Sequence, residues 1–535
     1  MAKKTNLKPS VKNNIVNKIL SSVKEFKLKH FLLLAIILIS ALLRFYKAQQ
    51  LFFWNVDEDI IALTVKRILI DHRPQLIGFP IPGGIYLGPL FYYIISIPYA
   101  LSLMNPQVLP VFSAIIGSIT VFLIYKVGKT IFEDKTVGFF GALIYGLSYL
   151  SNVYSRLLTG LSIVGILALL TYLFLYQNLR LKKPTNLLLL VIVLILSAQN
   201  EATSLSLIGL VAISWIIYRF KVPAKTAAFS IFLFILFHIP LLVFNLRHNF
   251  TIFRSFLNFF SKSSNDAWSS YNLLNIFEVF PKTLSRFLFI SGNNDISGQI
   301  LPCPYLVNNR NYTIIFVYIL AILILGYFLG SQILNKKISI GPKIITIHLG
   351  ILLIGLALFN LFLKGYFYEW TLVIFFPAFS LIVSYSLVQI SKKGALYKLA
   401  IFSLLLLFAF TNIRLTITSS NKFGLLSKVE AVKTALKETD DAPFYLDSIG
   451  SCFQEGYVYL FWYFAKQPFI SYADDFYGPG LIQKPKIQDP KLGIVMVNKA
   501  NWELSDFYSK YNFYRSKASK VLKVNEIEVL VVEEK

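Results

Sequence analysis

The sequence predicts a polytopic α-helical membrane protein, and three observations support this fold class. Apolar residues make up 56% of the 535 residues and charged residues only 15%, whereas soluble proteins are about 45–50% apolar. The apolar residues form runs of about 15 to 20 residues, close to the length of a membrane-spanning helix. The basic residues, which give a net charge of +25, fall in short clusters between these runs. Such clusters are typical of membrane topology and argue against nucleic-acid binding.

The first 46 residues predict the orientation of the chain. Residues 1–29 contain eight lysines and are expected to form a basic segment on the cytoplasmic side of the plasma membrane. The run 30–46 lacks a convincing cleavage site and is expected to remain as the first span. Ten further spans are expected at about 107–126, 137–152, 161–178, 186–200, 203–219, 225–245, 312–332, 343–363, 368–389 and 396–416. Eleven spans place the C-terminus outside, with 30–416 as the membrane domain.

The apolar segment 86–104 is expected to lie along the membrane surface. If it crossed, every later basic cluster from Lys126 onward would lie outside, against the positive-inside rule. Its many tyrosines and prolines are also typical of an interfacial helix. Four regions then share the outer side: the long loops 47–106 and 246–311, the turn around Arg156, and the tail.

The tail, 417–535, predicts a small soluble α/β domain outside the membrane. The spacing of apolar residues over 425–436 predicts an amphipathic helix, and the segment 455–466 is expected to form a second one. Buried strands are expected at 443–449 and 492–497, with a hairpin over 521–532 that turns at Asn525. Such a domain could act as a lid, as an acceptor platform or as a passive cap.

Three adjacent carboxylates, Asp57, Glu58 and Asp59, follow the first span. Hydrocarbon penalises a charged side chain by about 2.5 to 3.5 kcal/mol, so acids at a membrane surface indicate a function. A positioned carboxylate can deprotonate an acceptor hydroxyl on the face opposite a leaving phosphate, as inverting transfer from a polyprenyl-phosphate sugar requires. The alternative is structural, because acids also suit the first turn of a helix.

A lipid-linked donor also needs groups that bind its phosphate and sugar. Arg156 follows a span directly, and its planar guanidinium suits a phosphate. Arginines and tyrosines at span ends are more often lipid anchors, and the acid after Asn200 could simply mark a turn. The candidate donor-binding residues on the outer side are Arg156, Glu201, Arg247, His248, Tyr86 and Tyr92.

The order of the motifs along 30–390 resembles glycosyltransferase family 39, the GT-C fold group that includes protein O-mannosyltransferases and the aminoarabinose transferase acting on lipid A. The resemblance implies that Asp57 is the general base or orients the acceptor, with Glu58 in support. The motifs in question are Asp57-Glu58 before a surface helix, the Gly/Pro break 78–84, the segment from Tyr86 to Tyr93, Tyr154-Ser155-Arg156 and Asn245-Leu246-Arg247-His248.

Two departures from the family pattern limit what can be carried over. Members often have a second acid just after the arginine, but 157–160 supplies none, and Glu201 is the candidate substitute. Some members have a lysine ahead of the interfacial helix, where Gly83-Gly84 stands here. Cys303 and Cys452 form no CxxC or Cys/His cluster, so neither a disulfide framework nor a zinc site is indicated. No cofactor is assigned, and a need for a divalent cation is left open.

The sequence thus predicts a membrane glycosyltransferase, hexosyl or pentosyl and inverting. Its partners would be a polyprenyl-phosphate sugar, membrane lipids and an acceptor lipid, glycan or protein, with no nucleic acid. A polysaccharide polymerase or ligase is an alternative that the loop 246–311 would allow. A lipid-linked-sugar transporter or flippase is another, although such proteins usually show inverted repeats and ionisable groups at mid-membrane.

Overall fold

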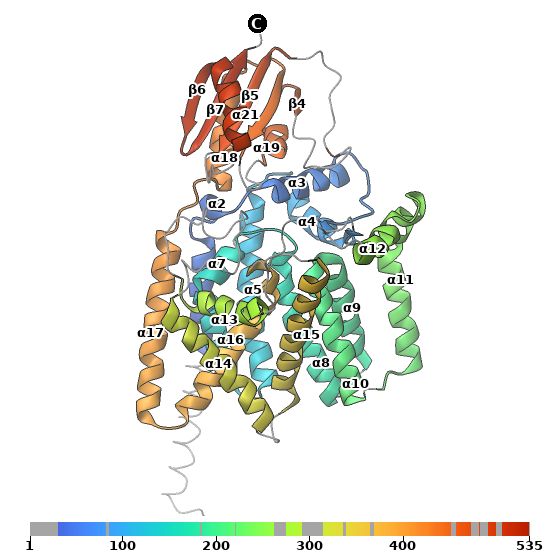
Figure 1. Ribbon diagram of the computed structural model, residues 1–535, viewed down its shortest axis with the longest axis vertical. Helices are drawn as coiled ribbons and strands as arrows, with labels where there is room; N and C mark the ends of the chain where they lie inside the picture. Colours follow the sequence, from blue (N-terminus) through green and yellow to red (C-terminus); the bar gives the residue numbers. More distant parts are fainter. Residues whose placement is uncertain are drawn as a thin grey trace, which may run out of the picture.

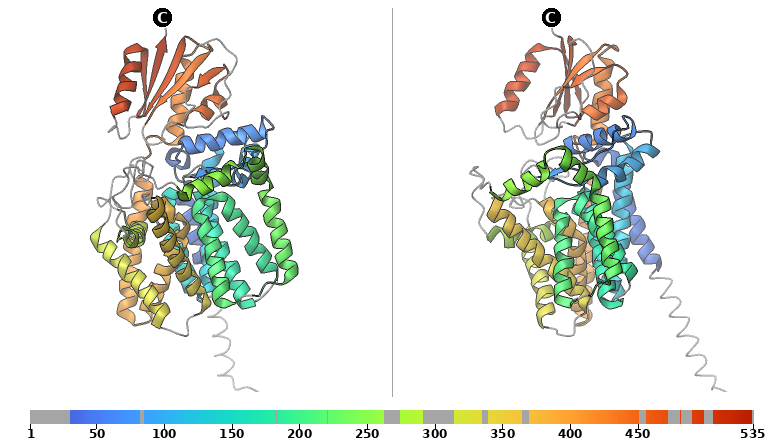
Figure 2. Two further views of the ribbon diagram at one scale, coloured as in Figure 1. Left: turned by 45° about the vertical axis from the view of Figure 1, so that its right-hand side comes forward. Right: turned by 90° about the vertical axis from the view of Figure 1, so that its right-hand side faces the viewer.

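The protein is a bundle of long helices with a small α/β unit on one end (Figures 1 and 2). The computed structural model describes residues 30–81, 85–181, 184–219, 221–261, 274–290, 314–334, 339–363, 369–450, 456–471, 481, 490–498 and 505–533. Cys303 and Cys452 lie outside these ranges. The two features that position the candidate site are the surface helices at the upper end of the bundle and the unit that rests on them.

A helix stands at each of the eleven predicted spans. The first runs from His30 to Phe45, and the others are α5 (Val108–Ile131), α6 (Lys135–Leu147) with α7 (Tyr149–Tyr154), α8 (Leu161–Leu181), α9 (Pro184–Asn200), α10 (Leu205–Tyr218), α11 (Ala224–Arg247), α14 (Ile315–Leu334), α15 (Ile340–Leu363), α16 (Phe376–Ser391) after the 3₁₀ turn η3 (Glu369–Phe375), and α17 (Ala395–Thr418). Among the described residues, seven helices are long and apolar enough to cross a membrane. The remaining apolar helices are shorter.

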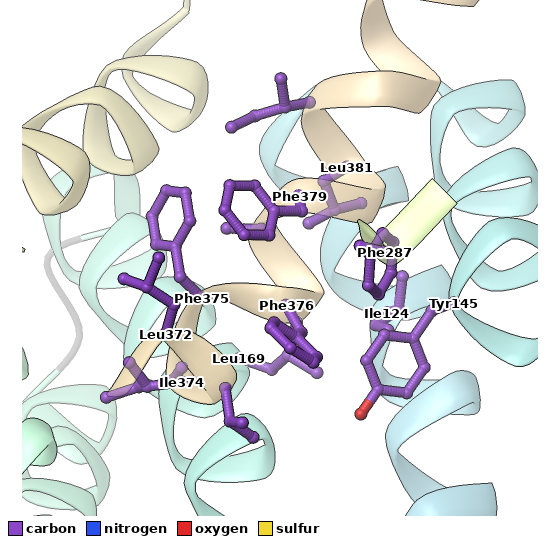
Figure 3. Close-up of a cluster of buried hydrophobic side chains, with 14 of the residues drawn as sticks. Ile124, Tyr145, Leu169, Phe287, Leu372, Ile374, Phe375, Phe376, Phe379 and Leu381 are labelled. Atoms are coloured by element: carbon purple, nitrogen blue, oxygen red, sulfur yellow. The ribbon is translucent and has the colours of Figure 1, made fainter. Parts of the chain in front are cut away.

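The helix α16 is the centre of the bundle. Its side chains are buried on nearly every face, as expected for a helix that is apolar all round. Phe376 and Phe379 pack against Phe287, with ring centroids 5.4 and 6.3 Å apart, and Phe375 packs against Phe379 at 5.1 Å (Figure 3). Gly128 lets α5 approach closely, because a Cβ there would come within 2.6 Å of the Leu381 side chain. Small residues at such contacts are how helices associate where no hydrophobic effect drives them together.

Two short helices lie across the upper end of the bundle (Figure 1). They are α3 (Val56–Leu69) and α4 (Leu90–Leu101). Between them, β1 (Pro80–Ile81) pairs antiparallel with β2 (Ile85–Tyr86). With 12 residues, α4 is too short to cross a bilayer, which needs about 20. Its length therefore agrees with the surface position that was predicted for 86–104.

The C-terminal unit has a five-stranded mixed sheet in the order β4-β3-β5-β7-β6. The strands are β3 (Phe444–Ile449), β4 (Phe469–Ser471), β5 (Leu492–Asn498), β6 (Ala518–Val524) and β7 (Ile527–Glu533). The strand β3 pairs parallel with β4 and β5, and the other pairs are antiparallel. The hairpin β6–β7 turns at Asn525, which has a positive φ of 55°, a conformation that asparagine tolerates well.

Alternate residues of the strands face opposite sides of this sheet, as the two-residue period of a strand requires. One face packs against α18 (Leu425–Lys437) and α19 (Val458–Phe464), and the other packs against α21 (Ser505–Lys517). The helix predicted over 425–436 is α18. The helix predicted over 455–466 begins at Val458 in the structure. The described part of the loop 246–311 contains α12 (Thr251–Ser261) and α13 (Leu274–Leu288), and α2 (Ala48–Leu51) precedes the acidic motif.

Candidate active site

The three adjacent carboxylates have three different environments. Glu58 closes the start of α3, because the backbone N–H of Asn55 donates to its Oε2 at 2.9 Å while the Asn55 side chain accepts from the backbone at Glu58. This reciprocal capping box satisfies N–H groups that the first turn of a helix leaves open. The structural interpretation of acids in a first helical turn is therefore correct for Glu58, which is fully buried.

Asp59 points towards the C-terminal unit. Its carboxylate accepts a hydrogen bond from Trp54 Nε1 at 3.2 Å and from the backbone N–H of Tyr459 at 3.1 and 3.3 Å. Tyr459 lies in the first turn of α19, so Asp59 supplies the negative charge that the N-terminus of a helix attracts. Asp59 thus joins two parts of the chain that are 400 residues apart.

Asp57 differs from Glu58 and Asp59 in its contacts. It is half-buried, and it has no hydrogen-bond or ion-pair partner among the described residues. Its negative charge contributes to raised pKa values at Tyr92 on α4 and at Glu201 after α9. The structure therefore brings Asp57, Tyr92 and Glu201 within electrostatic range of one another.

Burial raises the pKa values of the carboxyl groups of Asp57, Glu58 and Glu201 to different extents. Burial raises the pKa of Asp57 to about 6. Burial, with the charge of Asp57, raises the pKa of Glu58 to about 8. Burial likewise raises the pKa of Glu201 to about 7. At neutral pH, Asp57 is therefore mostly ionised, Glu58 mostly keeps its proton, and Glu201 lies near the midpoint of its titration. A carboxylate whose pKa is close to the working pH is well matched to general-base catalysis.

Glu201 is held beside the turn 157–160, which follows Arg156. Its Oε1 accepts from the backbone N–H of Ala202 at 3.0 Å, which caps the 3₁₀ turn η1 (Ala202–Ser204). Its Oε2 lies 3.2 Å from where a Cβ on Gly160 would be, and the Asn200 side chain donates to the Gly160 carbonyl at 2.7 Å. The loop that lacks the acid expected from the family pattern is thus packed directly against Glu201.

Arg156 lies beneath the acidic motif and is fully buried. Its Nη2 donates to the carbonyl of Leu43 at 3.0 Å, at the end of the first span. Its own carbonyl accepts from the N–H of Phe53 at 3.1 Å. Within the described ranges, its Nε and Nη1 have no partner. The residue closes the C-terminus of a helix and supports the segment that leads to Asp57, and its predicted contact with a donor phosphate stays a prediction.

Tyr86, Arg247 and His248 gather at another corner of the upper surface. Tyr86 packs against Phe244 with ring centroids 5.9 Å apart, and Phe244 stacks on His248 at 4.1 Å. Arg247 and His248 are exposed at the end of α11. The side chain of Gln199, two residues before Glu201, lies against Gly88, two residues after Tyr86.

Lys428 was missed by the sequence reasoning. It is 0% exposed, and its Nζ donates to the carbonyl of Trp54 at 2.6 Å. A signal was present, because Lys428 lies three residues after Leu425 and one before Val429, on the apolar face of α18. A lysine on such a face is buried only when it has a partner.

A buried ion pair was also missed. Arg286 on α13 pairs with Glu369 in η3, and the Tyr154 hydroxyl donates to the same carboxylate at 3.2 Å. Nothing local in the sequence indicates this pair, because its members are 83 residues apart. In the described part of the chain, no three His, Cys, Asp or Glu side chains lie close enough to hold a metal ion.

Comparisons with known proteins bear on the fold of the chain. Residues 87–244 match the family described as dolichyl-phosphate-mannose-protein mannosyltransferase. The crystal structure of ArnT from Cupriavidus metallidurans bound to undecaprenyl phosphate superposes with a TM-score of 0.59 and 9% identity, over 93% of this chain and 97% of that chain. Its apo state gives a TM-score of 0.53 and 11% identity over the same shares. The fold is of the GT-C type.

The family match confirms, over 87–244, the resemblance to glycosyltransferase family 39 that the motif order indicated. The oligosaccharyltransferase AglB from Archaeoglobus fulgidus, in complex with an inhibitory peptide and a dolichol-phosphate, matches with 16% identity over 77% of this chain and 59% of that chain. Its TM-score of 0.42 is too low to support an inference. No curated protein sequence matches the chain. Taken together, the family match and the fold support a membrane-embedded glycosyltransferase of the GT-C type.

Proposed function

We propose that the protein transfers a sugar from a polyprenyl-phosphate carrier to an acceptor hydroxyl, with Asp57 as the general base. The observation that carries this proposal is the state of the Asp57 carboxylate. It is half-buried at the upper end of the bundle, it has no hydrogen-bond partner within the described ranges, and its pKa is raised to about 6. A buried charge without a partner is costly, so a group kept in this state is a strong candidate for chemistry.

The donor class is supported by the fold. ArnT, whose structure was determined with undecaprenyl phosphate, shares the architecture of this chain over almost its whole length. A polyprenyl carrier would present its phosphate at the membrane surface, where α3 and α4 lie. The upper corner with Tyr86, Arg247 and His248 is the proposed place for the sugar phosphate, because an exposed cation and an aromatic ring suit an anion and a sugar.

The proposed step is a single displacement. The acceptor oxygen forms a bond to the anomeric carbon while the bond from that carbon to the phosphate oxygen breaks. The acceptor proton passes to Asp57, and the polyprenyl phosphate leaves with the electron pair. This geometry inverts the anomeric centre, since base and leaving group lie on opposite faces of the sugar. Glu58, which keeps its proton near neutral pH, would hold Asp57 in place through the first turn of α3.

The proposal places transfer on the outer side of the plasma membrane, with the N-terminus in the cytoplasm. The surface helices α3 and α4 and the C-terminal unit lie at one end of the bundle (Figure 1), and Asp57 belongs to the first turn of α3. The acceptor would reach Asp57 beside this unit, and could be a lipid, a glycan or a protein.

The test is transfer from a polyprenyl-phosphate sugar by the purified protein in lipid nanodiscs. We expect Asp57→Asn to lower kcat by about 10²- to 10⁴-fold, the usual contribution of a general base. Asp71→Asn is the matched control, because Asp71 follows the same helix and pairs with Lys66 at 2.9 Å. Wild-type rates in the Asp57→Asn protein would remove Asp57 from the mechanism.

A further inference from the structure

The segment from Leu51 to Asp59, which carries the acidic motif, is held between two parts of the chain. Below it, the carbonyl of Arg156 accepts from Phe53 N–H at 3.1 Å. Above it lies the C-terminal unit, which contacts the segment through α18 and α19 (Figure 1). We propose that this unit positions Asp57 for transfer, and that Lys428 and Asp59 are positioning residues; this inference rests on the function proposed above.

The first upper contact is made by Lys428. Its ammonium group donates to the carbonyl of Trp54, three residues before Asp57, and lies 4.7 Å from the ring centre of Tyr457. Its positive charge also acts on Glu58. Burying a lysine completely costs free energy unless its ammonium group interacts with a polar or charged partner. Here the charge faces the end of α3 where the carboxylates begin.

The second upper contact is made by Asp59, two residues after Asp57. Its bonds to the first turn of α19 and to the Trp54 indole fix the orientation of α3 about its axis. The Tyr459 side chain continues the contact, because its hydroxyl donates to the carbonyl of Met104 at 2.6 Å, beyond the end of α4. One residue of the C-terminal unit thus ties α3 to α4, the helix that carries Tyr92.

Two glycines allow the backbone of the C-terminal unit to contact the backbone of the segment from Leu51 to Asp59 closely. A Cβ on Gly424 would lie 2.0 Å from the carbonyl oxygen of Gln50, and a Cβ on Gly456 would lie 2.4 Å from that of Asn55. Gly456 also has a positive φ of 50°, which favours glycine. Gly424 forms an isolated antiparallel bridge with Phe53. Backbone therefore meets backbone on both sides of Trp54, and a shift of the C-terminal unit must shift the acidic motif.

Asp57 sits between the two upper contacts and makes no hydrogen bond of its own to a described residue. Its position is therefore set by the groups on either side of it. A displacement of about 1 Å at a reacting group can cost 100-fold in rate. We therefore expect damage to either contact to lower kcat more than it changes donor binding, which depends on groups elsewhere on the surface.

The experiment compares Lys428→Met with Lys520→Met in the full-length protein in nanodiscs. Methionine keeps the length and apolar character of the lysine stem but removes the donor and the charge. Lys520 belongs to the same unit but pairs at the surface with Glu438 at 2.6 Å. We expect Lys428→Met to lower kcat by about 10- to 100-fold with less than about a twofold change in KM for the donor. Lys520→Met should behave as wild type.

A second pair of variants tests how much the hydrogen bonds of Asp59 contribute to kcat. Asp59→Asn keeps an oxygen that can accept from Tyr459 N–H, whereas Asp59→Ala keeps none, so the loss of kcat should be larger for alanine. Hydrogen exchange at residues 53–60 is measured on the same samples. We expect faster exchange there in Lys428→Met and Asp59→Ala, with unchanged exchange in β5 and β7.

The inference is overturned if Lys428→Met and Asp59→Ala keep the wild-type kcat, or if kcat falls only in proportion to the amount of folded protein with no local change in exchange. Failure of the proposed function has a different signature. In that case the wild-type protein shows no transfer from a polyprenyl-phosphate sugar, while the exchange measurement still reports whether the C-terminal unit holds the acidic motif.

Discussion

The pKa of Asp57 leads to a quantitative prediction for the pH dependence of transfer. A general base works only when it is ionised, and kcat/KM reports the pKa of the free enzyme. Burial raises the pKa of Asp57 to about 6, so activity should be present above pH 6 and should be lost as the pH falls through this value. At about pH 5 only about one tenth of the base is ionised, and kcat/KM should be about tenfold below its plateau.

An aspartate with the ordinary pKa of 3.8 would behave differently. More than about 90% of it would still be ionised at about pH 5, and the rate would hardly change. The assay is the initial rate of sugar transfer in nanodiscs, and the donor does not interfere because a phosphodiester does not titrate in this range. Glu58→Gln is the control, since glutamine resembles the protonated acid. The assignment would be refuted if kcat/KM stayed constant down to about pH 5. It would also be refuted if Glu58→Gln shifted the pH at which kcat/KM falls.

Three further predictions test the surroundings of the site. Gly160→Ala should lower transfer at least tenfold, because a Cβ there would meet the backbone oxygen of Asn200 at 2.4 Å and displace the turn that packs against Glu201; Gly326→Ala, where nothing lies within 4 Å, should not. Arg156→Met should cost about 1–3 kcal/mol of stability with the donor KM unchanged, and a large rise in KM would instead favour phosphate binding. Glu369→Gln should destabilise the protein by about 3–5 kcal/mol, because Arg286 loses its buried partner; thermal unfolding at the wild-type temperature would contradict this.

Much of the fold could be predicted because hydrophobic length and charge bias act locally. Each apolar run of suitable length forms a helix whatever its neighbours are, since a backbone in hydrocarbon must satisfy its own hydrogen bonds. The surface position of α4 followed from the distribution of lysines, and the hairpin at Asn525 from a turn residue between two alternating runs. The family match over 87–244 confirms the resemblance to glycosyltransferase family 39 in that range.

The site was predicted less completely. The sequence singled out the acidic motif and Glu201, and the structure places Asp57 and Glu201 within electrostatic range. It could not tell the three acids apart, because side chains of consecutive helical residues point about 100° away from one another. Asp57 therefore faces Tyr92, while Asp59 faces the C-terminal unit. Arg156, Arg247 and His248 were grouped by type, but the structure distributes them between a buried support and an exposed corner.

The sequence by itself determined that the chain lies in a membrane, where its helices run and which end bears the carboxylates. These properties depend on residues that are close together along the chain. Only the tertiary structure decided which carboxylate is left without a partner and what holds it there. The deciding contacts join Trp54 to Lys428 and Asp59 to Tyr459, which are 374 and 400 residues apart. Contacts over such separations depend on how the whole chain packs, and no local pattern encodes them.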